Sequence, residues 1–233
     1  MTQKLIATAA LLAALIGAPA WAQEAPRQIS VTGEGVVEAE PDMATITLGV
    51  THEAEEAAAA MQATSEGVAA ILARLGDMGI APRDLQTRQL SLNPVWSQEK
   101  GDAEGRQYIS GFVASNTILV RVRDLSALGG ILDAVIADGA NDFSGLQFGV
   151  QEPKPLEDAA RKAAVAEAMA RAKLLADAAG VTLGPVVSIN DNGGGRMMPM
   201  AEMSMRMAAA KMPVAAGEVS VNASVSMVFS IGE

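Results

Sequence analysis

The amino-acid sequence predicts an α+β protein in which antiparallel sheets carry two long helices and one short helix. Residues 43–51 and 219–231 alternate apolar and polar side chains, which is the period of a strand with one buried face. Residues 57–78 and 157–179 repeat apolar side chains every three or four positions, which indicates helices. Strands precede each long helix, and this order favours helices packed on one face of a sheet.

The first part of the chain is expected to form two strands and a helix. Residues 29–39 and 43–51 read as strands joined by a turn at 40–42, where Pro and Asp favour chain reversal. Three acidic residues precede the following helix, where the positive end of its dipole favours negative charge: Glu53, Glu55 and Glu56. Gly79 is the expected end of that helix.

The middle of the chain adds strands and a short helix. Residues 85–96 and 108–123 are strand candidates separated by a polar stretch. Asp124 is a good N-cap for a short apolar helix that ends at Gly139. Residues 146–150 then alternate again, which predicts another strand.

The last part contains the strongest helix and the clearest strand. Helix 157–179 has a face made largely of Ala, which permits close approach to a sheet, and Gly180 ends it. A short strand is expected at 185–189, followed by a loop at 192–216 that is rich in Gly, Pro and Met. The strand at 219–231 has a polar face made almost wholly of Ser and Asn.

The N-terminus reads as a secretory signal peptide over residues 1–22. Lys4 supplies the positive charge, residues 5–16 form a short apolar run, and Ala20-Trp21-Ala22 matches an A-x-A cleavage site. We therefore expect cleavage after Ala22, export to a bacterial periplasm and a mature chain of residues 23–233.

The mature chain is expected to fold without disulfides, because a chain of this length can bury most of its apolar surface. Its length suits one large domain or two small lobes, and the sequence leaves both open. No later segment is long and apolar enough to be a transmembrane helix. The absence of Cys excludes lipoprotein attachment and disulfides.

Composition also excludes several kinds of chemistry. A chain with no Cys and one His cannot build a Cys/His zinc site or a cysteine nucleophile, and no cofactor-binding motif is present. Its formal net charge of −10 disfavours nucleic acid as a partner. The single His, His52, is expected at the surface, and Arg121 and Arg123 are expected to face water on a strand. We find no catalytic constellation and expect a protein that is not an enzyme.

Motif order along the chain resembles that of the SIMPL-domain family, also called the YggE-like or periplasmic immunogenic protein family. Each stretch is weak alone, but together they cover nearly all of the mature chain in the right order. The stretches are Ile29-Ser-Val-Thr-Gly-Glu-Gly35, Glu38-Ala-Glu-Pro-Asp42, Gly111-Phe-Val-Ala-Ser-Asn116, Val120-Arg-Val-Arg-Asp124, Gly139-Ala-Asn141 with Phe148, Arg171-Ala-Lys173, Ala179-Gly180 and Gly217-Glu218.

This resemblance implies a periplasmic α+β protein that assembles with further copies of itself, in a channel-like arrangement in some members. It also implies a link to envelope or oxidative-stress protection, with envelope components as further partners. No catalytic residues are established for the family, so the resemblance carries no site residue to this chain.

Methionine is the one residue type whose distribution suggests local chemistry. Seven of the thirteen Met lie between 197 and 212, with only one or two residues between several of them. Thioether sulfurs select Cu(I) over hard cations, so this spacing is compatible with a soft-metal site. The Cu(I) candidates are Met198, Met200, Met203, Met205 and Met207.

Two other interpretations of these Met residues stay open. Met is flexible and packs against irregular surfaces, so the cluster also suits an interface between copies or an unstructured loop. Oxidation of Met to the sulfoxide is reversible, so the cluster also suits a sink for oxidants. The sequence does not choose among the three.

Overall fold

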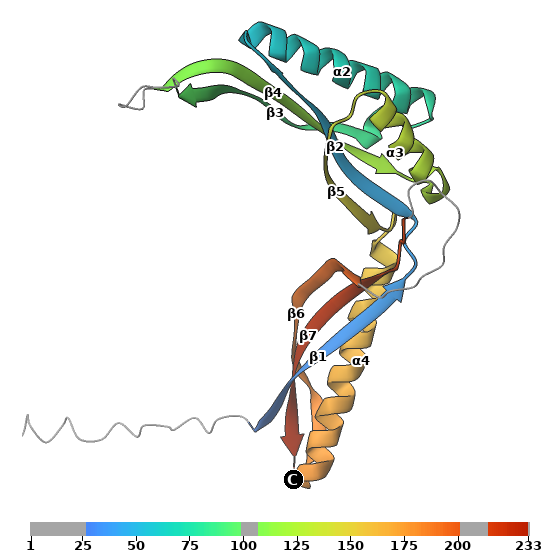
Figure 1. The fold of residues 1–233 in the computed structure, drawn as a ribbon. Coiled ribbons are helices and arrows are strands. Elements are labelled where there is room, and N and C mark those ends of the chain that lie inside the picture. Colours follow the sequence, from blue (N-terminus) through green and yellow to red (C-terminus); the bar gives the residue numbers. More distant parts are fainter. Residues whose placement is uncertain (1–26, 99–106, 201–213, 233) are drawn as a thin grey trace, which may run out of the picture.

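The computed structural model describes residues 27–98, 107–200 and 214–232, with side chains over the same ranges except 194–200. The strands form two separate antiparallel sheets, one in the order β1-β7-β6 and the other in the order β3-β4-β2-β5 (Figure 1). The elements are β1 (Gln28–Ala39), β2 (Met43–Ala54), α2 (Ala57–Asp77), η2 (Pro82–Asp84), β3 (Leu85–Gln98), β4 (Gln107–Val122), η3 (Leu125–Ala127), α3 (Leu128–Ala137), β5 (Asp142–Gly149), α4 (Lys154–Ala179), β6 (Thr182–Met200) and β7 (Glu218–Gly232).

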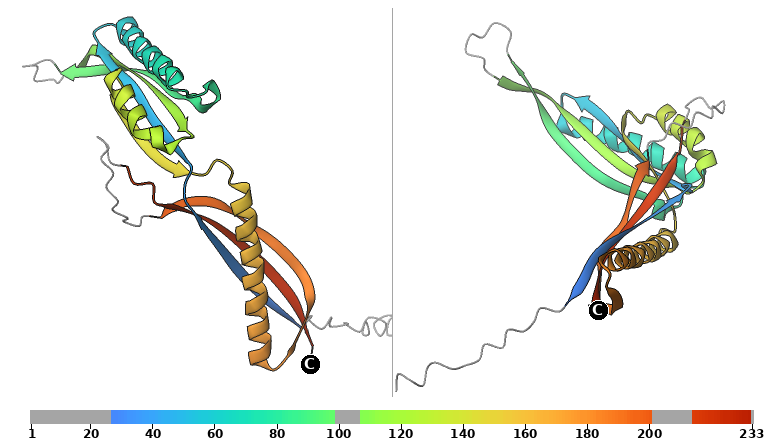
Figure 2. Two further views of the ribbon diagram at one scale, coloured as in Figure 1. Left: turned by 90° about the vertical axis from the view of Figure 1, so that its right-hand side faces the viewer. Right: turned by 90° about the horizontal axis from the view of Figure 1, so that it is seen from below.

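The three-stranded unit consists of β1, β7, β6 and α4, which lies along one face of the sheet (Figure 2). Alternate residues of β7, from Val219 to Phe229, lie on the face that carries the helix and are buried, while the opposite face is formed mainly by Ser and Asn. The helix contributes a stripe of fully buried Ala residues spaced four apart: Ala160, Ala164, Ala168, Ala172 and Ala176. Gly180, with φ 69°, ends α4 in the left-handed conformation that favours Gly.

Two glycines of β1 allow α4 to lie unusually close to the sheet. A Cβ on Gly33 would stand 2.1 Å from the carbonyl oxygen of Ala164, and one on Gly35 would stand 2.0 Å from that of Ala160. No real Cβ tolerates such distances, so these positions require Gly for space. The sequence Gly33-Glu34-Gly35 thus fixes the distance between α4 and the edge of this sheet.

The four-stranded unit carries α2 and α3 on one face of its sheet. Its core is made of large aliphatic side chains from β2, β4 and both helices, including Ile46, Leu48, Ile71 and Ile118, each at most 1% exposed. Helix α2 packs on β2 and β4 and scarcely reaches β3. The outer strand β3 is therefore left largely uncovered by helix.

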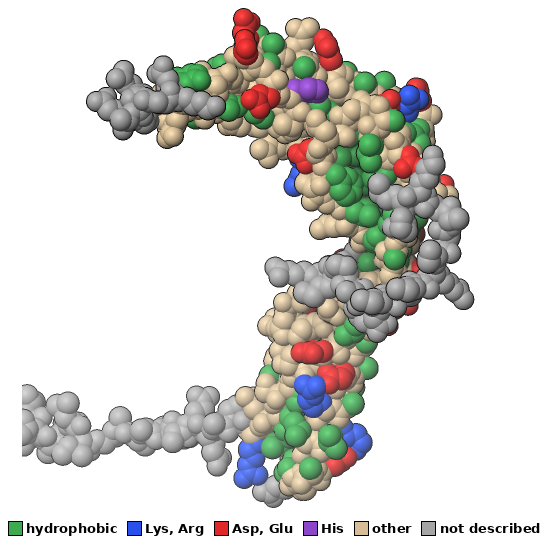
Figure 3. Space-filling view, in the orientation of Figure 1, with side chains coloured by type: hydrophobic (Ala, Val, Ile, Leu, Met, Phe, Trp, Pro, Cys, Tyr) green, Lys and Arg blue, Asp and Glu red, His purple; other side chains and the backbone are tan. Residues whose placement is uncertain are grey.

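The chain crosses between the two units twice, from β1 to β2 and from β5 to α4. The units follow one another along a crescent, and the helices lie on its outer side (Figures 1 and 2). Figure 3 shows the hollow of the crescent, where backbone and uncharged polar side chains outnumber charged ones. Among the described helices, none is both long and apolar enough to cross a membrane.

The predicted fold class is confirmed, because antiparallel sheets carry two long helices and one short one. Three details differ from expectation. Glu53 belongs to β2 and not to the helix end, whereas Glu56 is the N-cap of α2 and makes no side-chain capping bond. Asp124 caps the 3-10 turn η3 that precedes α3, by accepting the Ser126 N–H. Strand β6 continues to Met200, so the segment expected as a loop from 192 begins as a strand.

Candidate functional site

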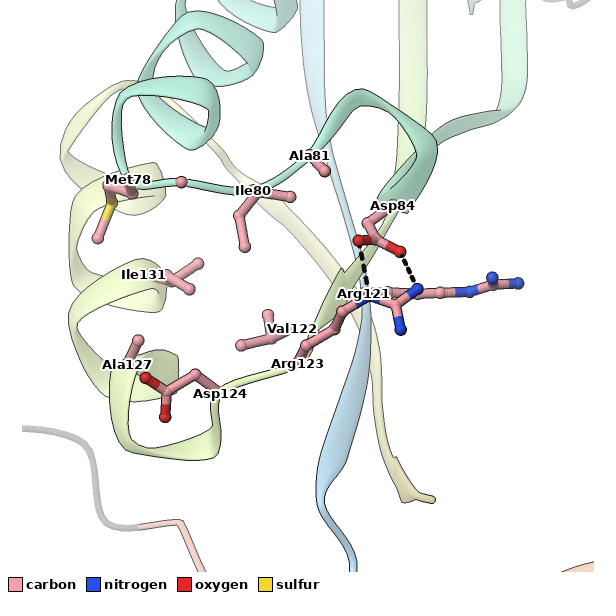
Figure 4. Close-up of a pocket in the computed structure, with 11 residues that line it drawn as sticks. Met78, Ile80, Ala81, Asp84, Arg121, Val122, Arg123, Asp124, Ala127 and Ile131 are labelled. Atoms are coloured by element: carbon pink, nitrogen blue, oxygen red, sulfur yellow. Dashed lines mark hydrogen bonds and ion pairs between the residues drawn. The ribbon is translucent and has the colours of Figure 1, made fainter. Parts of the chain in front are cut away.

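A pocket of about 340 Å³ lies at one end of the four-stranded unit, between the turn after α2, the end of β4 and the start of α3 (Figure 4). Its apolar part is formed by Ile80, Val122 and Ile131, and its polar part by Asp84 and Arg123. The Asp84 side chain is only 4% exposed although it carries a charge. A buried carboxylate needs a partner, and here it has one.

Arg123 binds Asp84 through both carboxylate oxygens. Its Nε donates to Oδ2 at 2.8 Å and its Nη2 donates to Oδ1 at 2.7 Å. These hydrogen bonds from the guanidinium hold the pKa of Asp84 below its usual value, against the opposing effect of burial. The same bonds raise the pKa of Arg123. The pair is therefore charged at neutral pH, so Asp84 carries no proton that it could donate as a general acid.

A second set of hydrogen bonds connects this ion pair to both crossings between the units. The Arg123 Nη1 donates to the Gln151 side-chain oxygen at 3.2 Å, and the Gln151 amide nitrogen donates back to the Arg123 carbonyl at 3.3 Å. The Gln151 backbone N–H donates to the Asp42 carboxylate at 2.7 Å. Asp42 precedes β2 and Gln151 precedes α4, so the network holds the two crossings together.

Three charged side chains of this pocket, Asp84, Arg123 and Asp124, thus bind other groups of the same chain. Asp84 binds Arg123, and Asp124 accepts from both the backbone N–H and the hydroxyl of Ser126. Arg121 extends away from the apolar part of the pocket in Figure 4. The arrangement can hold the two units at a fixed angle, and it presents no nucleophile paired with a base.

A more prominent feature is an apolar ledge on β3, formed by Leu90 and Leu92. They pair with Asn116 and Ala114 of β4, on the face that carries α2. Because α2 covers β2 and β4 and scarcely reaches β3, Leu90 is 56% exposed and Leu92 is 39% exposed. Two leucines of one strand face therefore meet solvent beside the helix.

The ledge continues into an arm, which we define as residues 95–98 of β3 and 107–111 of β4. The last β2 residue to pair with β4 is Ala54, opposite Phe112, so among the described strands the arm residues pair only with each other. The arm exposes Trp96, Tyr108 and Ile109 by about half of each side chain. A two-stranded ribbon is marginally stable alone in water, and exposed aromatic groups are typical of contact surfaces.

The residues singled out in the sequence are not brought together into a described site. Met198 and Met200 lie at the end of β6, in register with Ser220 and Glu218 of β7. Met203, Met205 and Met207 lie outside the described residues. Within the described part of the chain, no group of three or more His, Asp and Glu is placed to hold a metal ion.

His52 lies on β2 and is partly buried, with its Nδ1 atom enclosed and without a described hydrogen-bond partner. Arg121 is exposed, as expected for a strand residue that faces water. Arg123, which directly follows β4, is exposed as expected, and its guanidinium also pairs with a carboxylate 39 positions earlier in the chain. Only the tertiary fold brings Asp84 to that strand.

Comparison with known proteins gives consistent matches. The SIMPL family model, described as a protein of unknown function (DUF541), matches residues 29–229. The 26 kDa periplasmic immunogenic protein of Brucella melitensis is 42% identical, over an alignment that covers 93% of each chain. The uncharacterized protein YggE of Escherichia coli K12 is 34% identical, over 81% of this chain and 76% of its own length. YggE of Edwardsiella ictaluri is 33% identical, over 78% of each chain.

Proposed function

Because the chain belongs to the SIMPL family, we propose that it is a non-enzymatic periplasmic protein that self-associates through the β3 ledge and the arm. The observation that carries this proposal is the row of exposed apolar side chains on an outer strand and on the ribbon that extends from it. Envelope or oxidative-stress protection is the role that we assign to the assembled protein.

The periplasmic location rests on two supports. The signal-like sequence at residues 1–22 predicts export, and the Brucella relatives with 42% identity are named as periplasmic proteins. A chain without Cys also suits an oxidising compartment, because it cannot form wrong disulfides there.

Self-association is favoured by the size and position of the exposed apolar groups. Burial of one Leu side chain contributes about 1.5 to 3 kcal/mol, and an aromatic side chain buries a comparable or larger area. The ledge and the arm are continuous along β3 and β4, so one partner surface could cover Leu90, Leu92 and Trp96 together. A second copy supplies the same apolar groups and is therefore a matched partner.

Light scattering of the exported, purified protein tests this proposal. We expect assemblies larger than one chain at micromolar concentration. The double variant Leu90→Gln/Leu92→Gln should raise the dissociation constant at least about 10-fold, because two apolar contacts are replaced by polar ones. Its far-UV circular dichroism should stay unchanged, since both side chains are exposed.

The matched control replaces exposed apolar residues of the three-stranded unit. Val36 and Val187 are 58% and 61% exposed, and Val36→Gln/Val187→Gln should assemble like the unmodified protein. A protein that stays monomeric at every concentration would contradict self-association. Equal weakening by both double variants would contradict the assignment of the contact to the ledge.

Soft-metal binding through the Met-rich segment is the second candidate function. It is favoured by the density of Met between 197 and 212 and by the position of Met198 and Met200 at the end of β6, just before that segment continues. Competition with a Cu(I) chelator should show micromolar or tighter affinity. Substitution of Met200, Met203 and Met205 by Ser should abolish binding, and no Cu(I) uptake by the unmodified protein would exclude this function.

A further inference from the structure

The four outer strands of the two sheets differ in how regular their edges are. The ladders that join β3, β5 and β6 to their neighbours contain register shifts, which twist or interrupt a strand. The ladder between β1 and β7 runs from Gln28 to Ala39 without a shift. Strand β1 is therefore the outer strand with the longest uninterrupted edge among those described.

A long regular edge is a template for pairing with a strand of another chain. Its outward N–H and C=O groups can bond to an added strand, and this leads to aggregation unless the edge is blocked. Bulges protect β3, β5 and β6 to some degree. Strand β1 has no bulge, so its protection must come from another part of the molecule.

Two side chains of α4 occupy the backbone groups at the middle of this edge. The Glu34 N–H donates to the carboxylate Oε2 of Glu167 at 2.7 Å. The Arg171 Nη1 donates to the Thr32 carbonyl at 2.5 Å, and Arg171 also pairs with Glu167. Glu167 and Arg171 therefore supply one acceptor and one donor, the two groups that one residue of an added strand would supply.

The glycines of β1 make these bonds possible. Because Gly33 has no side chain, the backbone of α4 at Ala164 approaches the strand directly. Glu167 and Arg171 lie one and two turns further along α4 and reach past the strand to its outer edge. The glycines therefore serve the edge contact as well as the packing.

We propose that Glu167 and Arg171 form an edge guard that prevents strand addition to β1 by a second copy of this chain. The guard acts at residues 32–34, near the middle of the strand, so that only short stretches of the edge remain on either side of it. Exposed ion pairs contribute little to folding stability, so removal of this pair should leave the fold intact while it opens the edge of β1.

The test is the double variant Glu167→Ala/Arg171→Ala, with Lys173→Ala/Asp177→Ala as the matched control. The control removes another i,i+4 ion pair of α4, with a distance of 3.0 Å between Lys173 Nζ and Asp177 Oδ2, and it has the same net charge. Two quantities are measured, the exchange rate of the Glu34 amide hydrogen by NMR and thioflavin-positive assembly of agitated protein at about 100 µM.

We expect the Glu34 amide of the guard variant to exchange at least about 10-fold faster and the variant to form thioflavin-positive assemblies. The control should do neither. A guard variant that exchanges faster without assembling, or that assembles no faster than the control, would overturn the proposal. If the double variant does not fold, Glu167→Ala is compared with Glu167→Gln, which keeps an acceptor for the Glu34 N–H. Glu167→Gln should then form no thioflavin-positive assemblies, whereas Glu167→Ala should form them.

This test is independent of self-association through the β3 ledge. Assembly through the ledge is lost in Leu90→Gln/Leu92→Gln, whereas assembly through β1 would be gained in the guard variant. Combining the two double variants separates them, because strand addition at β1 should persist without the ledge.

Discussion

The two units of the molecule pack helices on one face of an antiparallel sheet, but they fill the interface in different ways. In the four-stranded unit, large aliphatic side chains of α2 and α3 interdigitate with those of β2 and β4. In the three-stranded unit, a row of Ala on α4 lies against Gly33 and Gly35 of β1 and against the apolar face of β7. The first interface depends on the volume of its side chains, and the second depends on the short distance between the backbones of helix and sheet.

This difference predicts opposite sensitivities to substitution. An interface filled by large side chains loses stability when a side chain is shortened, because a cavity remains. An interface at backbone contact distance loses stability when a side chain is added, because the helix must move away. In the three-stranded unit, close approach also brings α4 side chains to the edge of β1.

The largest effect is expected for Ile71→Ala in α2. Ile71 is fully buried in the four-stranded unit, so the variant should lose about 3 to 4 kcal/mol of unfolding free energy. Urea denaturation followed by circular dichroism measures this loss. Leu174→Ala on α4 is the control, because Leu174 is 67% exposed and should change stability by less than about 0.5 kcal/mol. Equal losses would contradict the assigned core.

A somewhat smaller effect is expected for Gly33→Ala in β1. The added Cβ would collide with the Ala164 carbonyl oxygen, so the variant should lose about 2 to 3 kcal/mol and its α4 amides should exchange faster. Gly145→Ala in β5 is the matched control, since a Cβ there meets nothing within 4 Å. If Gly33→Ala were as stable as Gly145→Ala, the close approach of α4 would be wrong.

Gln151→Ala tests how the two units are joined. The variant removes the side-chain bonds to Arg123 and to the Asp42 carbonyl and leaves both cores intact, so we expect a loss of about 1 kcal/mol. Small-angle X-ray scattering should show a broader range of dimensions. Lys162→Ala, at an exposed site on α4, should leave the scattering unchanged. An unchanged profile for Gln151→Ala would show that the network does not fix the angle between the units.

The smallest effect concerns the pH dependence of the Asp84–Arg123 pair. The folded-state pKa of Asp84 lies below its usual value of 3.8, because Arg123 donates two hydrogen bonds to the carboxylate. The pair therefore stabilises the fold fully above that usual value, and this stabilisation is lost as the pH falls through the lower folded-state pKa. Unfolding between pH 6 and pH 2.5 should show less acid sensitivity in Asp84→Asn than in the unmodified protein. Parallel pH profiles would contradict the lowered pKa.

Local patterns were sufficient to predict most elements. Gly79, Gly139 and Gly180 follow helices as expected, with positive φ at each, because helix ends favour the left-handed conformation that Gly adopts easily. Strand β6 was predicted too short, because its register shifts and the Gly residues at 193–195 interrupt the alternation that marks a strand. Its pairing with β7 is a long-range contact that local pattern does not contain.

The candidate surfaces were less predictable than the fold. Leu90 and Leu92 alternate as residues of a half-buried strand do, and nothing local distinguishes a leucine that a helix covers from one that it leaves exposed. The ion pair of Asp84 with Arg123 joins residues far apart in the chain, so its partners were not recognisable from spacing. The Met-rich segment was recognisable from spacing, and most of it lies outside the described residues.

By itself, the sequence determined the fold class, the family and the likeness of residues 1–22 to an export signal, because periodicity, glycine positions and motif order are properties of neighbouring residues. Tertiary structure decided which sheet each strand joins, which strand face lacks a helix and which sheet edge the α4 side chains reach. Those outcomes depend on contacts between distant segments, as when Glu167 accepts the N–H of Glu34 across 133 positions of the chain.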